Sequence, residues 1–269
     1  KMIVRFEDGS SAEGDLLVGA DGASSRVRRQ LLPHAQRMDT GLIMVTGKVP
    51  LDPAARRESP AALFKGPTLV LGPRGGFMFA GAVEYLQDHP HAYDQDESIM
   101  WGFSARRETL GFVGPTDEIP AEDARAAVLA QISDWSRDLR RLVERADASS
   151  LTAFAVKSSV PIKHWSTGRV TLLGDALHNM TPFRGIGANT ALRDAALLRD
   201  TLNEVEQGRE DLLPALSCYE RKMIDYGFAA VRMSLANMAR VHSRSPVTRL
   251  ATKAMLRLLG PALQTRMLD

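Results

Sequence analysis

The chain has 269 residues, of which 44% are hydrophobic and 25% are charged, and its formal net charge at pH 7 is +2. These values are ordinary for a globular protein of one or two domains, and the near-neutral charge gives no argument for a nucleic-acid partner. The single cysteine, Cys218, excludes an internal disulfide and any multi-cysteine metal site, which favours a reducing, cytoplasmic setting.

The first predicted elements are short strands followed by a helix. The apolar residues Ile3, Val4 and Phe6 lead into Asp8-Gly9, a dipeptide typical of hairpin turns. A stronger apolar strand follows over 15–20 and ends at an Asp-Gly turn, residues 21–22. Ser24 or Ser25 is placed to cap the next helix.

Residues 41–106 differ from the preceding segment in composition. Short segments rich in β-branched and aromatic residues alternate with glycine and proline, which predicts an antiparallel sheet. In the last of these segments Ile99, Trp101 and Phe103 share one face. From 121 to 147 the apolar residues recur at helical spacing, which predicts helix.

The rest of the chain returns to a strand–turn–helix pattern. An extended stretch near 154–165 leads to a buried strand at 169–173, and helices are predicted over 189–205, 212–242 and 247–259. Two strand–turn–helix units thus flank an inserted sheet. This order predicts an α/β fold in which a partial Rossmann-like nucleotide-binding domain is interrupted by an antiparallel β-sheet domain and followed by C-terminal helices. The predicted boundaries are 1–38 with 151–206 for the nucleotide-binding domain, 39–150 for the sheet domain with its linking helix, and 207–269 for the C-terminal helices.

The stretch 174–189 is the most informative part of the sequence. A buried strand places Asp175 at its carboxyl end, where open α/β sheets bind ligands, and a carboxylate there can accept hydrogen bonds from ribose hydroxyls. Gly185 and Gly187 allow close approach of a ligand to the backbone. A helix starting near Ala188 would direct N–H groups and its positive dipole end at a pyrophosphate or an anionic flavin edge. The residues alone equally allow a helix cap at Asp175 and a turn merely closed by glycines.

Two sequences resemble a known family. GDALHNMTPFRGIGANTALRDA, residues 174–195, resembles the second flavin-binding motif of the FAD-dependent monooxygenases with the para-hydroxybenzoate hydroxylase fold. DLLVGADGASSRVR, residues 15–28, resembles the other internal motif of that family. The motifs stand in the family's order, with a sheet domain between them. The matched positions of the longer motif are Gly174, Asp175, His178, Pro182, Gly185, Gly187, Asn189 and Asp194.

The resemblance implies roles for individual residues. Asp175 would bind the ribose region of FAD, and the backbone of 187–189 would contact the flavin ring and the pyrophosphate end. Pro182 and Phe183 would lie beside the isoalloxazine ring near the substrate, and the 21–22 turn would shape the FAD site. The complete cofactor-binding prediction is Asp21, Gly22, Gly174, Asp175, Pro182, Gly185, Gly187, Ala188 and Asn189.

Other side chains carry weaker predictions. Arg26 or Arg28 would serve the phosphates of NADPH or NADH, with a plain surface role as the alternative. His178 is expected to be a structural histidine rather than a general base, so no catalytic residue is assigned, and no grouping of histidines predicts a metal. The candidates for the substrate pocket are Met78, Phe79, Trp101, Phe103 and Phe183. Each of the four sheet residues taken singly fits the core better than the pocket.

The function that the resemblance implies is an FAD-dependent monooxygenase that uses NADPH or NADH and O₂ to hydroxylate or epoxidise an apolar or aromatic small molecule. The alternatives are a truncated, non-catalytic remnant of that fold that acts as a binding or interaction module, and a flavin halogenase or reductase.

The sequence departs from the family at its start. The family's G-x-G-x-x-G segment, carried by a βαβ unit, has no counterpart, since fourteen residues precede Asp15. We expect this segment to have been removed, to be supplied by another chain, or to be lost from the gene. Without it the chain is expected to bind FAD poorly and to expose a sheet edge.

The tail is basic. Residues 228–269 contain seven lysines and arginines and one acid, and the apolar positions of 250–259 fall on one helical face. Such a helix can lie on an anionic membrane surface or pack on its own domain. The pattern favours packing, with a cytoplasmic protein in peripheral membrane contact as the alternative.

Overall fold

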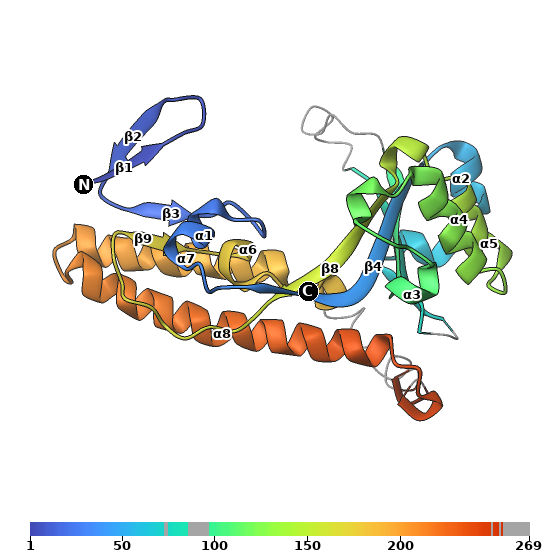
Figure 1. The fold of residues 1–269 in the computed structure, drawn as a ribbon. Coiled ribbons are helices and arrows are strands. Elements are labelled where there is room, and N and C mark those ends of the chain that lie inside the picture. Colours follow the sequence, from blue (N-terminus) through green and yellow to red (C-terminus); the bar gives the residue numbers. More distant parts are fainter. Residues whose placement is uncertain (73–74, 86–96, 249, 253, 255–269) are drawn as a thin grey trace. The chain divides into compact units, whose positions relative to one another are not determined.

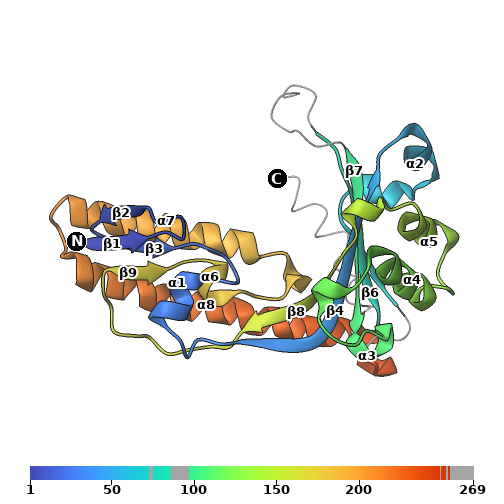
Figure 2. The same ribbon diagram turned by 45° about the horizontal axis from the view of Figure 1, so that its top comes forward.

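The computed structural model describes residues 1–72, 75–85, 97–248, 250–252 and 254. The chain divides into two compact units, Lys1–Asp39 with Lys157–Met238, and Thr40–Val156 with Ala239–Asp269. Figures 1 and 2 show the elements of both units. Strands β4 (Arg37–Pro50) and β8 (Thr152–Ser159) and helix α8 (Leu212–Val241) run across the divisions. The domain boundaries read from the sequence stay a prediction.

The first unit begins with a hairpin and a parallel strand pair. Strands β1 (Met2–Arg5) and β2 (Ser11–Gly14) pair antiparallel, whereas β3 (Leu17–Gly19) pairs in parallel with β9 (Val170–Leu172). Helix α1 (Arg26–Leu31) follows β3, and α6 (Asp175–His178) follows β9. Gly19 permits this packing, because a Cβ there would lie 2.6 Å from Leu172 Cδ2 and 2.9 Å from Val27 Cβ.

Two long helices complete the core of the first unit. A short 3₁₀ turn, η4 (Pro182–Arg184), precedes α7 (Gly187–Glu206), and α8 follows it. Tyr219 of α8 donates a hydrogen bond to the carbonyl of Leu172, and the buried Glu220 accepts one from the Thr171 hydroxyl at 3.0 Å. These bonds hold α8 against β9. The buried apolar residues of this core are Leu32, Trp165, Leu172, Ala176, Leu177, Met180, Leu198, Leu216, Tyr219, Met223, Phe228, Ala230 and Val231.

The second unit is built on a five-stranded sheet. Its order is β5 (Thr68–Leu71), β6 (Phe77–Val83), β7 (Ser98–Arg106), β4 and β8. The pairs β5–β6, β6–β7 and β7–β4 are antiparallel. The other elements are α2 (Pro53–Glu58), η1 (Ala61–Phe64), α3 (Arg107–Leu110), η2 (Thr116–Glu118), α4 (Ala121–Gln131), α5 (Arg137–Glu144) and η3 (Ala148–Ser150). The helical region predicted over 121–147 is thus two helices.

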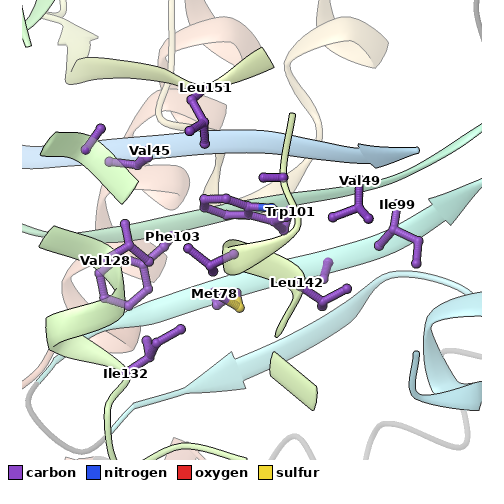
Figure 3. Packing of buried hydrophobic residues seen from close by; sticks show 14 of the residues in the cluster. Val45, Val49, Met78, Ile99, Trp101, Phe103, Val128, Ile132, Leu142 and Leu151 are labelled. Carbon is purple, nitrogen blue, oxygen red and sulfur yellow. The ribbon is translucent and has the colours of Figure 1, made fainter. Parts of the chain in front are cut away.

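One face of this sheet forms the second core. Ile99, Trp101 and Phe103 alternate along β7 and point to the same side, where Val128 of α4 and Leu142 of α5 cover them (Figure 3). All five of these side chains are at most 3% exposed. The opposite face carries the even-numbered residues of β7. The inserted antiparallel sheet confirms the predicted fold class.

The tail leaves one prediction open. Most of the predicted helix 247–259, with its basic residues Arg249 and Lys253, lies outside the described residues. Within the part of the chain that is described, no helix has the length and apolarity to cross a membrane.

Candidate cofactor site

A cavity of about 550 Å³ lies in the first unit, at the carboxyl ends of β3 and β9. Backbone and side chains from the 20–22 turn, the 173–175 turn, residues 180–187 and the first turns of α7 line it. The structure brings together seven of the nine predicted cofactor-binding residues in this lining, namely Gly22, Gly174, Asp175, Pro182, Gly185, Gly187 and Ala188. Two loops that lie about 150 positions apart in the sequence therefore share one cavity.

The glycines that line the cavity are needed for different reasons. Gly22 and Gly185 have φ of +72° and +64°, a conformation that side-chain-bearing residues rarely adopt. Gly174 has φ of +61°, and a Cβ there would lie 2.9 Å from the Cβ of Ala191, so this glycine lets α7 pack against the end of β9. At Gly187 a Cβ would meet only Met180 Cγ, at 3.9 Å. The absence of a side chain at Gly187 therefore leaves room for a ligand rather than for the protein.

The start of α7 gives the cavity its polarity. The first intrahelical bond runs from the Thr190 N–H to the Ile186 carbonyl at 2.9 Å, so the N–H groups of 187–189 lack an intrahelical acceptor. Together with the dipole of a 20-residue helix, these donors favour an anionic group at this end. Asn189 is exposed and is not part of the lining, so the backbone role predicted for it stays a prediction.

Asp21 supports its turn and does not line the cavity. Its Oδ2 accepts hydrogen bonds from the backbone N–H groups of Arg26, at 2.6 Å, and Val27, at 3.2 Å. Burial acts to raise the pKa of Asp21, but hydrogen bonds from Ser25, Val27 and Arg26 outweigh it and lower the pKa below its ordinary value. The carboxylate thus caps α1 and shapes the turn that carries Gly22.

Arg28 connects the two loops of the site. Its side chain is 6% exposed, and Nη1 donates to the carbonyls of Ala23 at 3.1 Å and Ala176 at 2.8 Å. Burial lowers the pKa of this guanidinium. The prediction that Arg28 serves the phosphates of a nicotinamide cofactor does not fit this burial, because the side chain is committed to two carbonyls. Arg26 is exposed and forms an ion pair with Glu7, and its predicted phosphate role stays a prediction.

A buried network holds the 174–178 turn from the opposite side. Asp194 Oδ2 accepts hydrogen bonds from the Gly174 N–H at 2.7 Å and contacts His178 Nε2 at 2.7 Å, while its Oδ1 accepts from the Tyr226 hydroxyl at 2.5 Å. The side chains of Asp194 and His178 are fully buried. Burial raises the pKa of Tyr226, and the bond to Asp194 raises it further. His178 therefore acts as part of the scaffold beneath the cavity.

The comparisons with known proteins identify the family. A family model described as an FAD binding domain matches residues 4–233. The chain belongs to the FAD-binding domain family. Its relatives include the dual O-methyltransferase/FAD-dependent monooxygenase elcB of Phaeosphaeria nodorum, 33% identical over 73% of this chain and 24% of that protein. Another is the 3-amino-4-hydroxybenzoate 2-monooxygenase PtnB3 of Streptomyces platensis, 31% identical over 91% of this chain and 52% of the relative.

Solved structures agree with this assignment. The crystal structure of a putative FAD-containing monooxygenase from Photorhabdus luminescens has a TM-score of 0.78 and 34% identity, and the match covers 88% of this chain and 64% of that one. The resemblance to the FAD-dependent monooxygenases with the para-hydroxybenzoate hydroxylase fold is thereby confirmed. The chain spans about half or less of the length of the curated relatives described above.

The cavity has the features that FAD requires. An FAD-binding domain must hold ribose hydroxyls, a pyrophosphate and a flat ring system. The cavity offers a carboxylate at Asp175, N–H donors at the start of α7, and backbone without side chains at Gly185 and Gly187. Its volume of about 550 Å³ lies within the range of about 300–1,000 Å³ that ligand pockets occupy. No group of three or more potential metal ligands occurs among the residues that were placed.

Three of the five candidates for the substrate pocket lie in the core, as their residue types favoured. Met78, Trp101 and Phe103 are at most 1% exposed and belong to the helix-covered core, because their alternation along β6 and β7 places them on that face. Phe79 lies on the opposite face, where its ring covers Gly102, since a Cβ at Gly102 would be 2.3 Å from Phe79 Cε1. Phe183 is 8% exposed in the first unit and is not part of the cavity lining.

Sequence reasoning missed three polar residues of the site. Tyr226 binds Asp194, Asn179 binds Asp175, and Arg37 binds Asn179. Asn179 lies inside the quoted motif, but its residue type gave no distinctive signal. Arg37 and Tyr226 reach the site only through the fold, so no local pattern could have indicated them.

Proposed function

We propose that this protein is an FAD-dependent monooxygenase that hydroxylates a small aromatic compound, with NADH or NADPH as reductant and O₂ as co-substrate. The observation that carries the proposal is the cavity that the two motif loops and the start of α7 form together. The relatives support the reaction class, because one is named an FAD-dependent monooxygenase and the other a monooxygenase of 3-amino-4-hydroxybenzoate.

The residues of the first unit would bind and orient the cofactor. Asp175 would accept a hydrogen bond from a ribose hydroxyl, and the N–H groups at 187–189 would face a negatively charged group. Gly185 and Gly187 would let the ring system lie against the backbone. FAD held there would supply the redox chemistry between the reduced nicotinamide and O₂. Arg28 and Asp194 would hold the two loops in place while this happens.

Within the second unit, the candidate surface for aromatic recognition is the sheet face that α4 and α5 do not cover. Leu69, Phe79 and Gly102 stand side by side on β5, β6 and β7, so they form one row across this face. Leu69 is 52% exposed, and Met100, which shares the face, is 38% exposed. A row with an exposed leucine and a half-buried phenylalanine ring over a glycine suits a planar apolar substrate.

The test is reconstitution with FAD followed by turnover. The protein is titrated with FAD, and NADH or NADPH oxidation and O₂ consumption are recorded with a panel of hydroxybenzoates and other small phenols. Substrate-stimulated oxidation with an oxygenated product, identified by mass spectrometry, supports the proposal. FAD binding without a product from any reductant would refute the monooxygenase assignment, and a failure to take up FAD would point to a non-catalytic binding module.

A further inference from the structure

Asp175 is held by a neighbour that in turn is held by an arginine. The side-chain amide of Asn179 donates from Nδ2 to Asp175 Oδ2 at 3.1 Å. The Oδ1 of the same amide accepts a hydrogen bond from Arg37 Nε, also at 3.1 Å. Asp175 opens α6, Asn179 directly follows α6, and Arg37 opens β4, 142 positions earlier in the chain than Asn179. The three side chains form a continuous chain of hydrogen bonds.

The donor-to-acceptor direction of these hydrogen bonds is fixed by the groups at the two ends. A guanidinium N–H can only donate and an ionised carboxylate can only accept, so the amide between them has one workable orientation. Its oxygen must face Arg37 and its nitrogen must face Asp175. Asn179 is 8% exposed, and its backbone carbonyl accepts from the Ser159 N–H at 2.8 Å, so the residue has little freedom to leave this position.

The arrangement commits one oxygen of Asp175 and leaves the other available. Oδ2 is bound by Asn179, and among the described residues no hydrogen bond to Oδ1 occurs. Asp175 is partly buried and lines the cavity. Fixing Oδ2 removes rotational freedom from the carboxylate before a ligand arrives, and pre-organisation of this kind improves affinity because less entropy is lost on binding.

Arg37 also contributes charge. A diphosphate cofactor brings negative charge to a cavity that already contains a carboxylate, and the two repel each other. The guanidinium of Arg37 is partly buried and close enough to Asp175 for the two charges to interact. A cation behind Asn179 therefore offsets part of this repulsion, in a setting where solvent screens it less than at the surface.

We propose that Arg37 and Asn179 are positioning residues for FAD, acting through Asp175. We call the hydrogen-bonded series Arg37–Asn179–Asp175 the relay. It holds the Asp175 carboxylate in the orientation that a ribose hydroxyl needs and keeps a positive charge behind it. This inference rests on the proposed role of Asp175 in binding FAD.

The experiment measures the dissociation constant of FAD by flavin fluorescence and the thermal midpoint of the FAD-free protein. The variants are D175A, N179A, R37Q and, as a matched control, R29Q, which removes an exposed arginine of α1. Loss of a charge-assisted hydrogen bond corresponds to ~10-fold weaker FAD binding for N179A and R37Q. R29Q should stay within about twofold of the wild type.

The variants separate the proposed role of Asp175 in binding FAD from the proposed role of the relay. If D175A binds FAD as tightly as the wild type, the proposed role of Asp175 fails, and the relay fails with it. If D175A loses affinity while N179A and R37Q keep it, only the relay is overturned. Weakened binding in all three, with thermal midpoints of N179A and R37Q near the wild-type value, supports the relay.

N179D keeps the inference testable if N179A does not fold. It places a second carboxylate against Asp175, with Arg37 of β4 and Arg28 of α1 as the nearby cations. Facing carboxylates share a proton as the pH falls, which restores a donor to Asp175. N179D should therefore bind FAD weakly at pH 8 and recover at least fivefold relative to the wild type by about pH 5. An affinity ratio that does not change with pH overturns the relay.

Discussion

Replacement of Asp194 by asparagine should loosen the loop beneath the cofactor site. The fully buried carboxylate serves three groups, the Gly174 N–H, His178 Nε2 and the Tyr226 hydroxyl. An asparagine of nearly the same volume keeps one acceptor oxygen but puts an NH₂ group where the other oxygen stood, so at least one of the three interactions is lost. A hydrogen bond to a charged group contributes ~1.5–3 kcal/mol, and an unsatisfied buried donor adds to the loss, so D194N should cost about 2–4 kcal/mol in the first unit.

Amide hydrogen exchange measures this locally. A loss of about 2–4 kcal/mol corresponds to roughly 30- to 700-fold faster exchange in peptides that cover α6 and α7, while peptides from β6 and β7 should be unaffected. D200N is the matched control, because Asp200 lies on the same helix but forms only an exposed pair with Arg199. It should change protection by less than about threefold. Equal protection of α7 in D194N and D200N would show that the Asp194 network does not hold this turn.

Three further outcomes follow from the structure. G187A should raise the free energy of unfolding of the FAD-free protein by ~0.5–1 kcal/mol, since the new Cβ meets only Met180 within 4 Å. The same change should weaken FAD binding at least ~10-fold in a fluorescence titration, and unchanged affinity would contradict the cavity assignment. D21A should lower stability by ~1 kcal/mol at pH 7. Because the pKa of Asp21 is lowered from 3.8, this contribution is present above the unfolded-state pKa and is lost as the pH falls through the lower folded-state pKa. The difference in urea unfolding between D21A and wild type should therefore shrink as the pH falls below 3.8, and a pH-independent difference argues against this role. G102A should cost ~1–3 kcal/mol through its clash with the Phe79 ring, and the G102A/F79A double variant should cost less than the sum of the single changes; strict additivity would show that the ring does not cover Gly102.

The nucleotide-binding half was readable from the sequence because its determinants are local. A strand that ends in Gly-Asp, a turn that needs glycine at positive φ, and a helix that begins directly after it are all encoded within about twenty residues. The same holds for Asp21, whose carboxylate caps a helix five positions later. Such features depend on backbone conformation and nearest neighbours, so they appear in the sequence wherever the turn is formed.

Local pattern could not decide which of the candidate pocket residues belong to the core. Periodicity correctly placed Ile99, Trp101 and Phe103 on one face of a strand, but it does not say which face the helices will cover. Only the packing of α4 and α5 decided that this face is the core and that Phe79 lies on the other one. Large apolar side chains suit a core and a pocket equally well, so residue type could not choose between them.

The sequence by itself determined the two motif loops, the class of fold and the cofactor family, because each of these rests on short runs of residues with a required backbone geometry. The tertiary structure decided which side chains support those loops. Arg28 joins Ala176 across 148 positions, where β3 pairs with β9. Arg37 joins Asn179 across 142 positions, where backbone bonds join Gln36 to Val160 and Ser159 to Asn179. Hydrogen bonds of this range depend on the position of each donor in space, which no spacing along the chain records.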